Sequence, residues 1–289
     1  MVSVIEGLEL YPSLIMKTNP SLRNRILVAA IIIPVLLLFA WLGGWFFAIL
    51  IALVVGRAVY ELWELFNKNG YHPALVLLLF FTPLAVLMRH RLEFQYSDVF
   101  LALLILSAMF YYVVRQKNGG TNSATSLFIT IGAPLYLGWL GAYAISLRNL
   151  DNGLFWLLLV LAVNSMADTG AYALGSRFGR HKMFPQVSPH KSWEGYFGGI
   201  ATGVLTGLAI AALSQPFMPA ITLMQGVILG LVIPVLAPMG DFGESMIKRN
   251  FNVKDSSTIL LDHGGFLDRI DSALWAVVIG YYLVLVIGF

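Results

Sequence analysis

The sequence predicts an all-α, polytopic integral membrane protein with about nine transmembrane helices. Of its 289 residues, 58% are hydrophobic and only 11% are charged, against about 25% charged residues in ordinary soluble domains. So few charges cannot cover a water-soluble surface, which excludes a soluble enzyme, a disordered chain and a collagen-like fibre. The apolar runs are continuous and do not alternate with period two, which argues against a β-barrel.

Nine apolar runs, bounded by charges, glycine or proline, are candidate transmembrane helices. A helix needs about 20 residues to cross about 30 Å of hydrocarbon, so nine helices use about 180 residues and leave about 110 for loops. The runs fall at roughly 26–42, 45–60, 73–88, 98–114, 126–147, 154–174, 196–214, 217–238 and 273–289.

These runs divide the chain into three parts. Residues 1–25 are expected to form an N-terminal cytoplasmic extension, and the first twenty of them lack the basic-then-apolar order of a secretory signal. Residues 26–150 form an N-terminal transmembrane region of about five spans that carry almost no chemically reactive side chains. Residues 151–289 form a C-terminal transmembrane region with cytoplasmic loops at 175–195 and 239–272, which hold most of its charged residues. We therefore expect the functional site within residues 160–272.

The positions of Lys and Arg predict the orientation in the membrane. With the N-terminus inside and nine crossings, three basic residues fall in segments on the outer side: Arg89, Arg91 and Arg148. Fourteen fall in cytoplasmic segments: Lys17, Arg23, Arg25, Lys68, Arg115, Lys117, Arg177, Arg180, Lys182, Lys191, Lys248, Arg249, Lys254 and Arg269. Because cytoplasmic loops carry the excess of basic residues, the N-terminus and both polar loops are predicted to face the cytoplasm.

Asp168 is an ionisable residue inside the predicted span at 154–174. Such a residue is costly in a membrane and by default marks a function or a buried partner. Asn164 and Ser165 share its helix face, and for these two a polar seam between helices remains an equal alternative. For Asp168 we favour a functional role, because Arg57 is the only cation within any other predicted span.

The first polar loop places two hydroxyls and a lysine just before a helix. Ser188, Lys191 and Ser192 precede the span at 196–214, whose N-terminus would attract an anion. This arrangement is compatible with phosphate binding. Arg177, in the same loop, fits the ordinary positive charge of a cytoplasmic loop.

The second polar loop holds the densest set of charges. A helix that opens at Gly240 would place Asp241, Glu244, Ser245 and Lys248 on one face. Carboxylates beside cations offer hard oxygen ligands next to phosphate-binding groups. Carboxylates, water and substrate phosphates are the usual environment of Mg²⁺.

A glycine pair and a second acidic helix face follow in the same loop. Gly264 and Gly265 permit a close backbone approach, and Asp268 and Asp271 share a predicted helix face. Five scattered histidines and no cysteine give no zinc-ligand spacing. A solvated charged helix would explain one or two of these charges, but not the cluster of acids, bases and glycines beside a membrane.

These segments together resemble the signature of the phosphatidate cytidylyltransferases (CDP-diacylglycerol synthases). That signature has Ser, two residues, Lys-Arg, four residues, Lys-Asp, a short stretch to Pro-x-His-Gly-Gly, two residues and Asp-Arg-x-Asp. The chain matches it with Ser245, Lys248-Arg249, Lys254-Asp255, His263-Gly264-Gly265, Asp268-Arg269 and Asp271. The segments around Asp168, Lys191 and Asp241 also resemble the family, so the resemblance covers about 160–289. Leu261 stands where the family usually has proline, which leaves that loop less rigid.

The resemblance implies an integral membrane nucleotidyltransferase of phospholipid biosynthesis, which makes CDP-diacylglycerol and pyrophosphate from CTP and phosphatidate. It implies Mg²⁺ in a two-metal site, held first by Asp241 and Asp268, with Asp168 and Asp271 as further candidates. The expected catalytic residues are Asp241, Asp268, Lys248, Arg249, Arg269 and His263, the last positioning a group rather than abstracting a proton. The expected substrate-binding residues are Ser188, Lys191, Ser192, Ser245, Lys254, Gly264 and Gly265.

The expected partners are CTP, phosphatidate and the lipid bilayer, with no nucleic acid; the resemblance also suggests a homodimer. The expected location is the cell (inner) membrane, with the active site facing the cytoplasm. A CTP-dependent lipid kinase or an isoprenoid-lipid cytidylyltransferase would share the nucleotide site and differ in the lipid. A transporter for an anionic metabolite fits less well, because the charges gather at one membrane face and the first five spans hold almost no polar residues.

Overall fold

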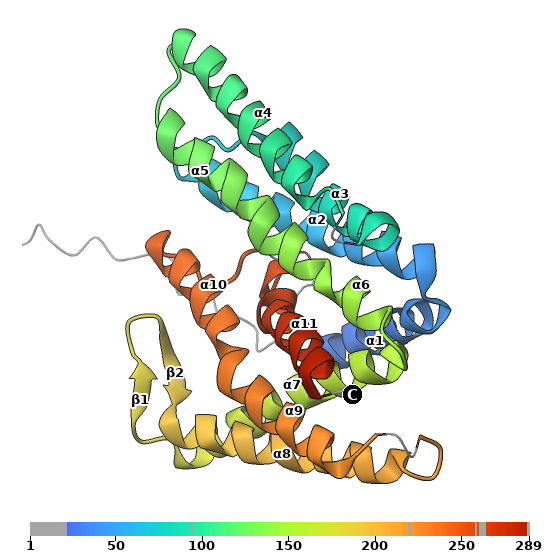
Figure 1. Ribbon diagram of the computed structural model, residues 1–289. Coiled ribbons are helices and arrows are strands. Elements are labelled where there is room, and N and C mark those ends of the chain that lie inside the picture. The colour runs from blue at the N-terminus through green and yellow to red at the C-terminus, as the bar shows by residue number, and fades with distance from the viewer. Residues whose placement is uncertain (1–21, 94, 219–220, 258, 260–263, 288–289) are drawn as a thin grey trace, which may run out of the picture.

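A computed structural model describes residues 22–93, 95–218, 221–257, 259 and 264–287 as a helical bundle with one small sheet (Figure 1). Its elements in order are α1 (Leu22–Leu42), α2 (Gly44–Lys68), α3 (Leu75–Leu92), α4 (Ser97–Lys117), α5 (Ser123–Ala133), the π-helix η1 (Pro134–Trp139), α6 (Tyr143–Arg148), α7 (Gly153–Phe178), β1 (Lys182–Phe184), β2 (Ser188–Ser192), α8 (Trp193–Ser214), α9 (Leu223–Leu236), α10 (Pro238–Asn250) and α11 (Leu267–Ile287).

The predicted class is confirmed: the chain is an all-α, multi-pass membrane protein. Among the described residues, eight helical segments are long and apolar enough to cross a membrane, and each matches a predicted span. One of them combines α5, η1 and α6, and another combines α9 and α10. The first predicted span, at 26–42, lies within α1, whose described part includes the apolar stretch Ala30–Leu42.

Helix α10 continues α9, although the sequence predicted that a loop begins at residue 239. The two form one helical segment of 28 residues, Leu223–Asn250. Pro238 is the first residue of α10, a position where proline removes no helical hydrogen bond. The predicted loop at 239–272 is therefore helical at both ends, where it belongs to α10 and to α11.

The predicted loop at 175–195 contains a β-hairpin that the sequence reading did not anticipate. Strands β1 and β2 pair antiparallel, with Lys182 opposite Ser192 and Phe184 opposite Ser188. The hairpin lies beside α10 in Figure 1, and the ring of Phe184 packs edge-on against that of Phe242, with ring centroids 4.9 Å apart. It therefore brings the end of α7 and the start of α8 next to the charged face of α10.

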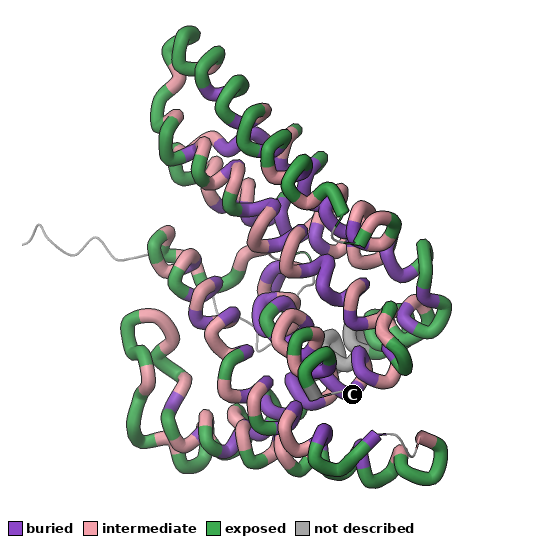
Figure 2. The backbone as a smooth tube through the Cα atoms, in the orientation of Figure 1, coloured by how far each residue is buried: buried purple, intermediate pink, exposed green. Residues whose placement is uncertain are grey.

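Two features of the packing position the site. Glycines let α8 approach its neighbours closely, since a Cβ on Gly207 would collide with the backbone of Gly226 in α9. An apolar cluster joins the two halves of the chain, with Leu62 of α2 and Leu137 of η1 packed together with Leu267 and Leu274 of α11. Figure 2 shows the buried positions gathered in the middle of the bundle, whereas α4 is largely exposed.

Candidate active site

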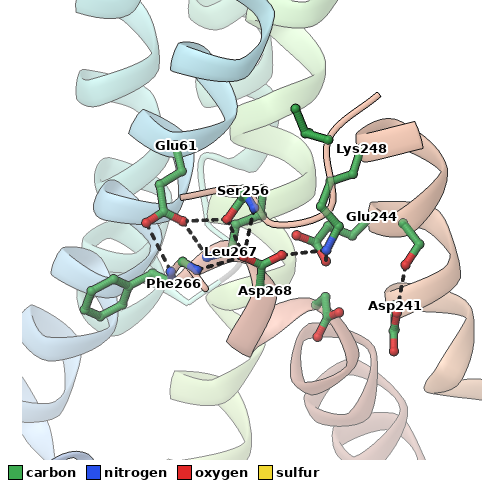
Figure 3. Close-up of polar contacts among 12 residues, drawn as sticks. Glu61, Asp241, Glu244, Lys248, Ser256, Phe266, Leu267 and Asp268 are labelled. Atoms are coloured by element: carbon green, nitrogen blue, oxygen red, sulfur yellow. Dashed lines mark hydrogen bonds and ion pairs between the residues drawn. The ribbon is translucent and has the colours of Figure 1, made fainter. Parts of the chain in front are cut away.

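The residues predicted to be functional gather where the charged face of α10 meets the N-terminal end of α11 (Figure 3). The loops that join α7 to α8 and α10 to α11 lie at this same end of the bundle. Two groups of contacts can be distinguished there. We call them the buried centre (Glu61, Glu244, Lys248, Ser256 and Asp268) and the open centre (Asp168, Lys191, Asp241 and Ser245).

Lys248 is the cation of the buried centre. Its Nζ donates to Glu244 Oε2 at 2.8 Å, one helical turn earlier, and to Asp268 Oδ1 at 2.5 Å across to α11. The side chains of all three residues are at most 9% exposed. Because charges taken out of water need paired partners, this ion triad fixes α10 against the start of α11.

Asp268 also organises the loop before α11. Its Oδ2 accepts hydrogen bonds from the backbone N–H of Ser256 (2.9 Å), the hydroxyl of Ser256 (2.7 Å) and the backbone N–H of Gly265 (2.7 Å). Gly264 has a φ of +78°, which favours glycine. A Cβ on Gly265 would collide with the Glu61 carboxylate and the Ser256 hydroxyl. The glycine pair thus permits the close approach that the sequence predicted.

Asp241 belongs to the open centre. Its Oδ2 forms an ion pair with Lys191 Nζ at 2.6 Å, and its Oδ1 accepts from the Ser245 hydroxyl at 3.1 Å. The side chains of Asp241 and Lys191 are 35% and 30% exposed, so a ligand can reach both. The ammonium of Lys191 also lies 4.3 Å from the centre of the Phe242 ring, a cation–π contact.

Asp168 lies on α7 with an exposed side chain and joins the polar seam with α11. The hydroxyl of Ser272 lies 3.4 Å from Asp168 Oδ2, and Asn164 donates to that hydroxyl at 3.1 Å. Asn164 therefore fills the interhelical role that the sequence left open. The backbone N–H of the same Ser272 donates to Asp271 Oδ1, so Ser272 joins Asp168 of α7 to Asp271 of α11.

The donor set fits Mg²⁺ only together with water or substrate. Within the described part of the chain, no group of three or more His, Asp or Glu side chains is arranged to hold a metal alone. Asp168 and Asp241 nevertheless offer accessible carboxylates. Oε1 of Glu244 is buried without a hydrogen-bond partner among the described residues. Because Mg²⁺ keeps several waters and uses one or two carboxylates plus substrate phosphates, such a set suffices.

Three predicted residues lie in structural positions beside the site. The guanidinium of Arg249 donates to the carbonyls of Val187 (3.3 Å) and Val253 (2.8 Å), which ties the end of α10 to the hairpin. Ser192 is the N-cap of α8, where its hydroxyl accepts from the Gly195 N–H. Ser188 begins β2.

The remaining predicted residues differ in their exposure. Lys254 and Arg269 are exposed, Lys254 in the loop after α10 and Arg269 in the first turn of α11, near the buried centre. Asp271 is buried, and its Oδ1 accepts from the N–H of Ser272 at 2.7 Å. His263 and Leu261 fall outside the described residues.

Glu61 is the principal residue that the sequence-based prediction missed, because the site was expected in the C-terminal half of the chain and Glu61 belongs to α2. It lies in the C-terminal half of α2, one residue beyond the predicted span, and its side chain is 0% exposed. Its carboxylate accepts from the backbone N–H groups of Phe266 and Leu267 and from the Ser256 hydroxyl (Figure 3). In the sequence, Glu61 and Glu64 precede Lys68 and the turn residues Asn69 and Gly70, which is typical of an ordinary helix end. The role of Glu61 therefore becomes visible only in the fold.

A second unexpected group comes from the π-helix η1. The hydroxyl of Tyr136 is buried without a hydrogen-bond partner among the described residues. Short π-helical turns occur frequently at functional sites.

Fold and site together define a multi-pass membrane protein with acidic and basic centres at one end of its bundle. The chain belongs to the cytidylyltransferase family, whose sequence profile matches residues 23–287. It is 33% identical over 272 residues to a phosphatidate cytidylyltransferase of Bacillus subtilis (91% of this chain, 97% of the relative). It is 33% identical over 266 residues to that of Pseudomonas aeruginosa (89% and 94%), and 28% identical over 292 residues to that of Synechocystis sp. (91% and 97%).

Proposed function

We propose that this protein is a phosphatidate cytidylyltransferase, which makes CDP-diacylglycerol and pyrophosphate from CTP and phosphatidate. The observation that carries the proposal is similarity over nearly the whole length of relatives with that name. The clustering of the signature residues at one end of the bundle agrees with it. In the reaction, a phosphate oxygen of phosphatidate bonds to the α-phosphorus of CTP. The bond from that phosphorus to the pyrophosphate oxygen breaks, and pyrophosphate leaves with the electron pair.

In this proposal, the residues of the open centre and the nearby exposed cations bind the phosphates. Lys191 and Asp241 are accessible and can exchange their ion pair for contacts with phosphate and metal. Lys254 and Arg269 add cations that offset the charge on the transferred group. Phosphatidate is already an anionic nucleophile, so the site needs no strong general base. His263 would then position a group beside the phosphates.

Mg²⁺ would neutralise charge on the attacking and leaving oxygens. Asp241 and Asp168 are the residues that would hold it with least rearrangement, because each presents an accessible carboxylate. Asp268 and Asp271 remain proposed ligands for a second ion. Asp268 would have to exchange at least one of the four contacts that its carboxylate now accepts.

One assay separates this function from its alternatives. Purified protein receives Mg²⁺ and CTP labelled either at the α- or at the γ-phosphate, with phosphatidate, an isoprenyl phosphate or diacylglycerol as acceptor. We expect α-label in the lipid and release of pyrophosphate with phosphatidate alone. Transfer of γ-label to diacylglycerol would instead indicate a lipid kinase, and α-label on the isoprenyl phosphate would indicate a different lipid substrate.

The proposed orientation places the active site in the cytoplasm of the cell. The hairpin residue Gln186 and the α6–α7 loop residue Asp151 are exposed and fall on opposite sides in the predicted topology. Since the chain contains no cysteine, Gln186→Cys and Asp151→Cys each provide a single thiol. We expect an impermeant thiol reagent to label Asp151→Cys in intact cells and Gln186→Cys only after the inner face is opened; the reverse pattern would overturn the topology.

A further inference from the structure

The carboxylate of Glu61 on α2 accepts three hydrogen bonds from the segment that leads into α11. Its carboxylate accepts from Phe266 N–H at 3.1 Å, Leu267 N–H at 2.9 Å and Ser256 Oγ at 3.1 Å, although these residues are about 200 positions later in the chain. On its own helix, its carboxylate pairs with Arg57 at 3.3 Å. A fully buried carboxylate in the N-terminal half of the chain thus forms most of its hydrogen bonds with the C-terminal half.

We propose that Glu61 is a positioning residue for the reaction, which holds the start of α11 and the Ser256 segment so that Asp268 and Lys248 keep their alignment. The inference rests on the proposed function, because it assigns Glu61 a part in the same site. It goes beyond that function by placing an essential group on α2, outside the signature region.

The first step of the argument concerns the helix end. Phe266 and Leu267 carry N–H groups at the N-terminus of α11, which no helical carbonyl can satisfy. Both point at the Glu61 carboxylate, and a negative charge is favoured there by the helix dipole. Asp268 is the next residue along this turn, so whatever fixes Leu267 also fixes Asp268.

The second step concerns Ser256, which lies between two carboxylates in Figure 3. Its hydroxyl lies 3.1 Å from Glu61 Oε2 and 2.7 Å from Asp268 Oδ2. A hydroxyl has one hydrogen to donate, so the two acids compete for it, while the Ser256 N–H bonds Asp268 alone. Glu61 therefore influences how firmly Asp268 is held, and through it the 2.5 Å contact to Lys248.

The third step explains why the residue must be a carboxylate. Glu61 uses both of its oxygens as acceptors: Oε1 for Phe266 and Oε2 for Leu267 and Ser256. A glutamine of the same shape has one acceptor oxygen and one NH₂ donor. Its NH₂ would face a backbone N–H group. A buried donor without an acceptor destabilises the folded state, because it loses its hydrogen bonds to water. Glu61→Gln therefore disturbs the loop with little change in side-chain volume.

The test compares Glu61→Gln with three other variants. Glu61→Asp keeps both acceptors on a shorter side chain. Glu64→Gln is the matched control, since Glu64 lies on the same helix and pairs at the surface with Lys68. Leu104→Ala removes a buried side chain from a cluster away from the site. It shows how a general loss of stability affects kcat, the melting temperature and hydrogen exchange.

We expect Glu61→Gln to lower kcat about 10- to 100-fold, since a misplacement of about 1 Å can cost about 100-fold. The KM for CTP should stay within about threefold, because a group that acts on geometry changes kcat more than substrate binding. Glu61→Asp should recover part of the rate, and Glu64→Gln should match the wild type. Backbone amides of Phe266 and Leu267 should exchange hydrogen faster in Glu61→Gln than in Leu104→Ala.

Two results would overturn the inference. One is an unchanged kcat in Glu61→Gln together with unchanged exchange at Phe266 and Leu267. The other is a Glu61→Gln protein that behaves like Leu104→Ala, with a lower melting temperature, unchanged kcat and uniformly faster exchange. If the wild type makes no CDP-diacylglycerol, the proposed function fails separately. The exchange comparison then still decides whether Glu61 holds the loop.

Discussion

The buried centre and the open centre use the same residue types in opposite ways. In the buried centre, Lys248 is enclosed by Glu244 and Asp268, and all three side chains are at most 9% exposed. In the open centre, Lys191 and Asp241 form an equally short ion pair, but about a third of each side chain remains exposed. Both centres are contacts of α10, so the difference arises from what covers them.

The difference in exposure indicates in which centre a ligand can replace an existing ion pair. Breaking a buried ion pair leaves an uncompensated charge and costs about 3–5 kcal/mol, whereas an exposed pair is worth about 0–1 kcal/mol. A metal ion or a phosphate can therefore displace the Lys191–Asp241 contact at little cost. This supports the proposal that the buried centre fixes the geometry of the site and that the open centre binds the ligands.

The largest expected effect comes from removing the cation of the buried centre. Lys248→Met keeps the length of the side chain and leaves Glu244 and Asp268 buried without their common partner. We expect a loss of about 3–5 kcal/mol in the free energy of unfolding, together with loss of activity. Unfolding in detergent, followed by tryptophan fluorescence, measures the first effect.

A double variant provides the control. Lys248→Met with Glu244→Gln removes one of the two stranded acids and should regain part of the lost stability, because the two sites share one network. A single variant that melts with the wild type would show that the triad does not hold α10 to α11.

A smaller effect is expected from crowding the same centre without changing its charge. In Gly265→Ala the new Cβ meets the Glu61 carboxylate and the Ser256 hydroxyl. Overpacking of this kind costs about 1–3 kcal/mol, and the displaced loop should lower activity. Gly243→Ala on α10 is the control, since its Cβ would meet no atom within 4 Å. Equal melting temperatures for the two variants would contradict the tight fit at Gly265.

The sequence predicted the helices because hydropathy and length decide a membrane span locally. It also predicted which face of α10 carries Asp241, Ser245 and Lys248, since helical periodicity alone sets that face. The β-hairpin could not be predicted. Its strands have three and five residues, and they are stabilised by packing against α10, which the local sequence does not reveal.

The division of the site into two centres also could not be predicted from the sequence. Asp241 and Asp268 look alike in the chain, and both were expected to be metal ligands. Only the fold brings Lys191 to the first and Lys248, Ser256 and Gly265 to the second. Glu61 was missed for the same reason, because a contact between residues 61 and 267 leaves no trace in local spacing.

The smallest effect on stability, with a large effect on function, is expected in the open centre. Asp241→Asn removes one charge from a pair that water already screens, so the free energy of unfolding should change by less than about 1 kcal/mol. Activity should nevertheless be lost or need far more Mg²⁺, because the change removes an accessible anionic ligand. A Mg²⁺ titration of the cytidylyl-transfer rate, beside a melting curve, separates the two effects.

Asp151→Asn supplies the matched control for this last variant. Asp151 is exposed in the loop between α6 and α7, away from both centres, so its amide variant should keep the wild-type rate and the wild-type Mg²⁺ dependence. If Asp241→Asn instead loses stability as Lys248→Met does, the open centre is structural and the contrast between the centres fails. If it keeps near-normal turnover at low Mg²⁺, Asp241 is not a metal ligand, and Asp168 becomes the acid to test next, because it too presents an exposed carboxylate to the same region.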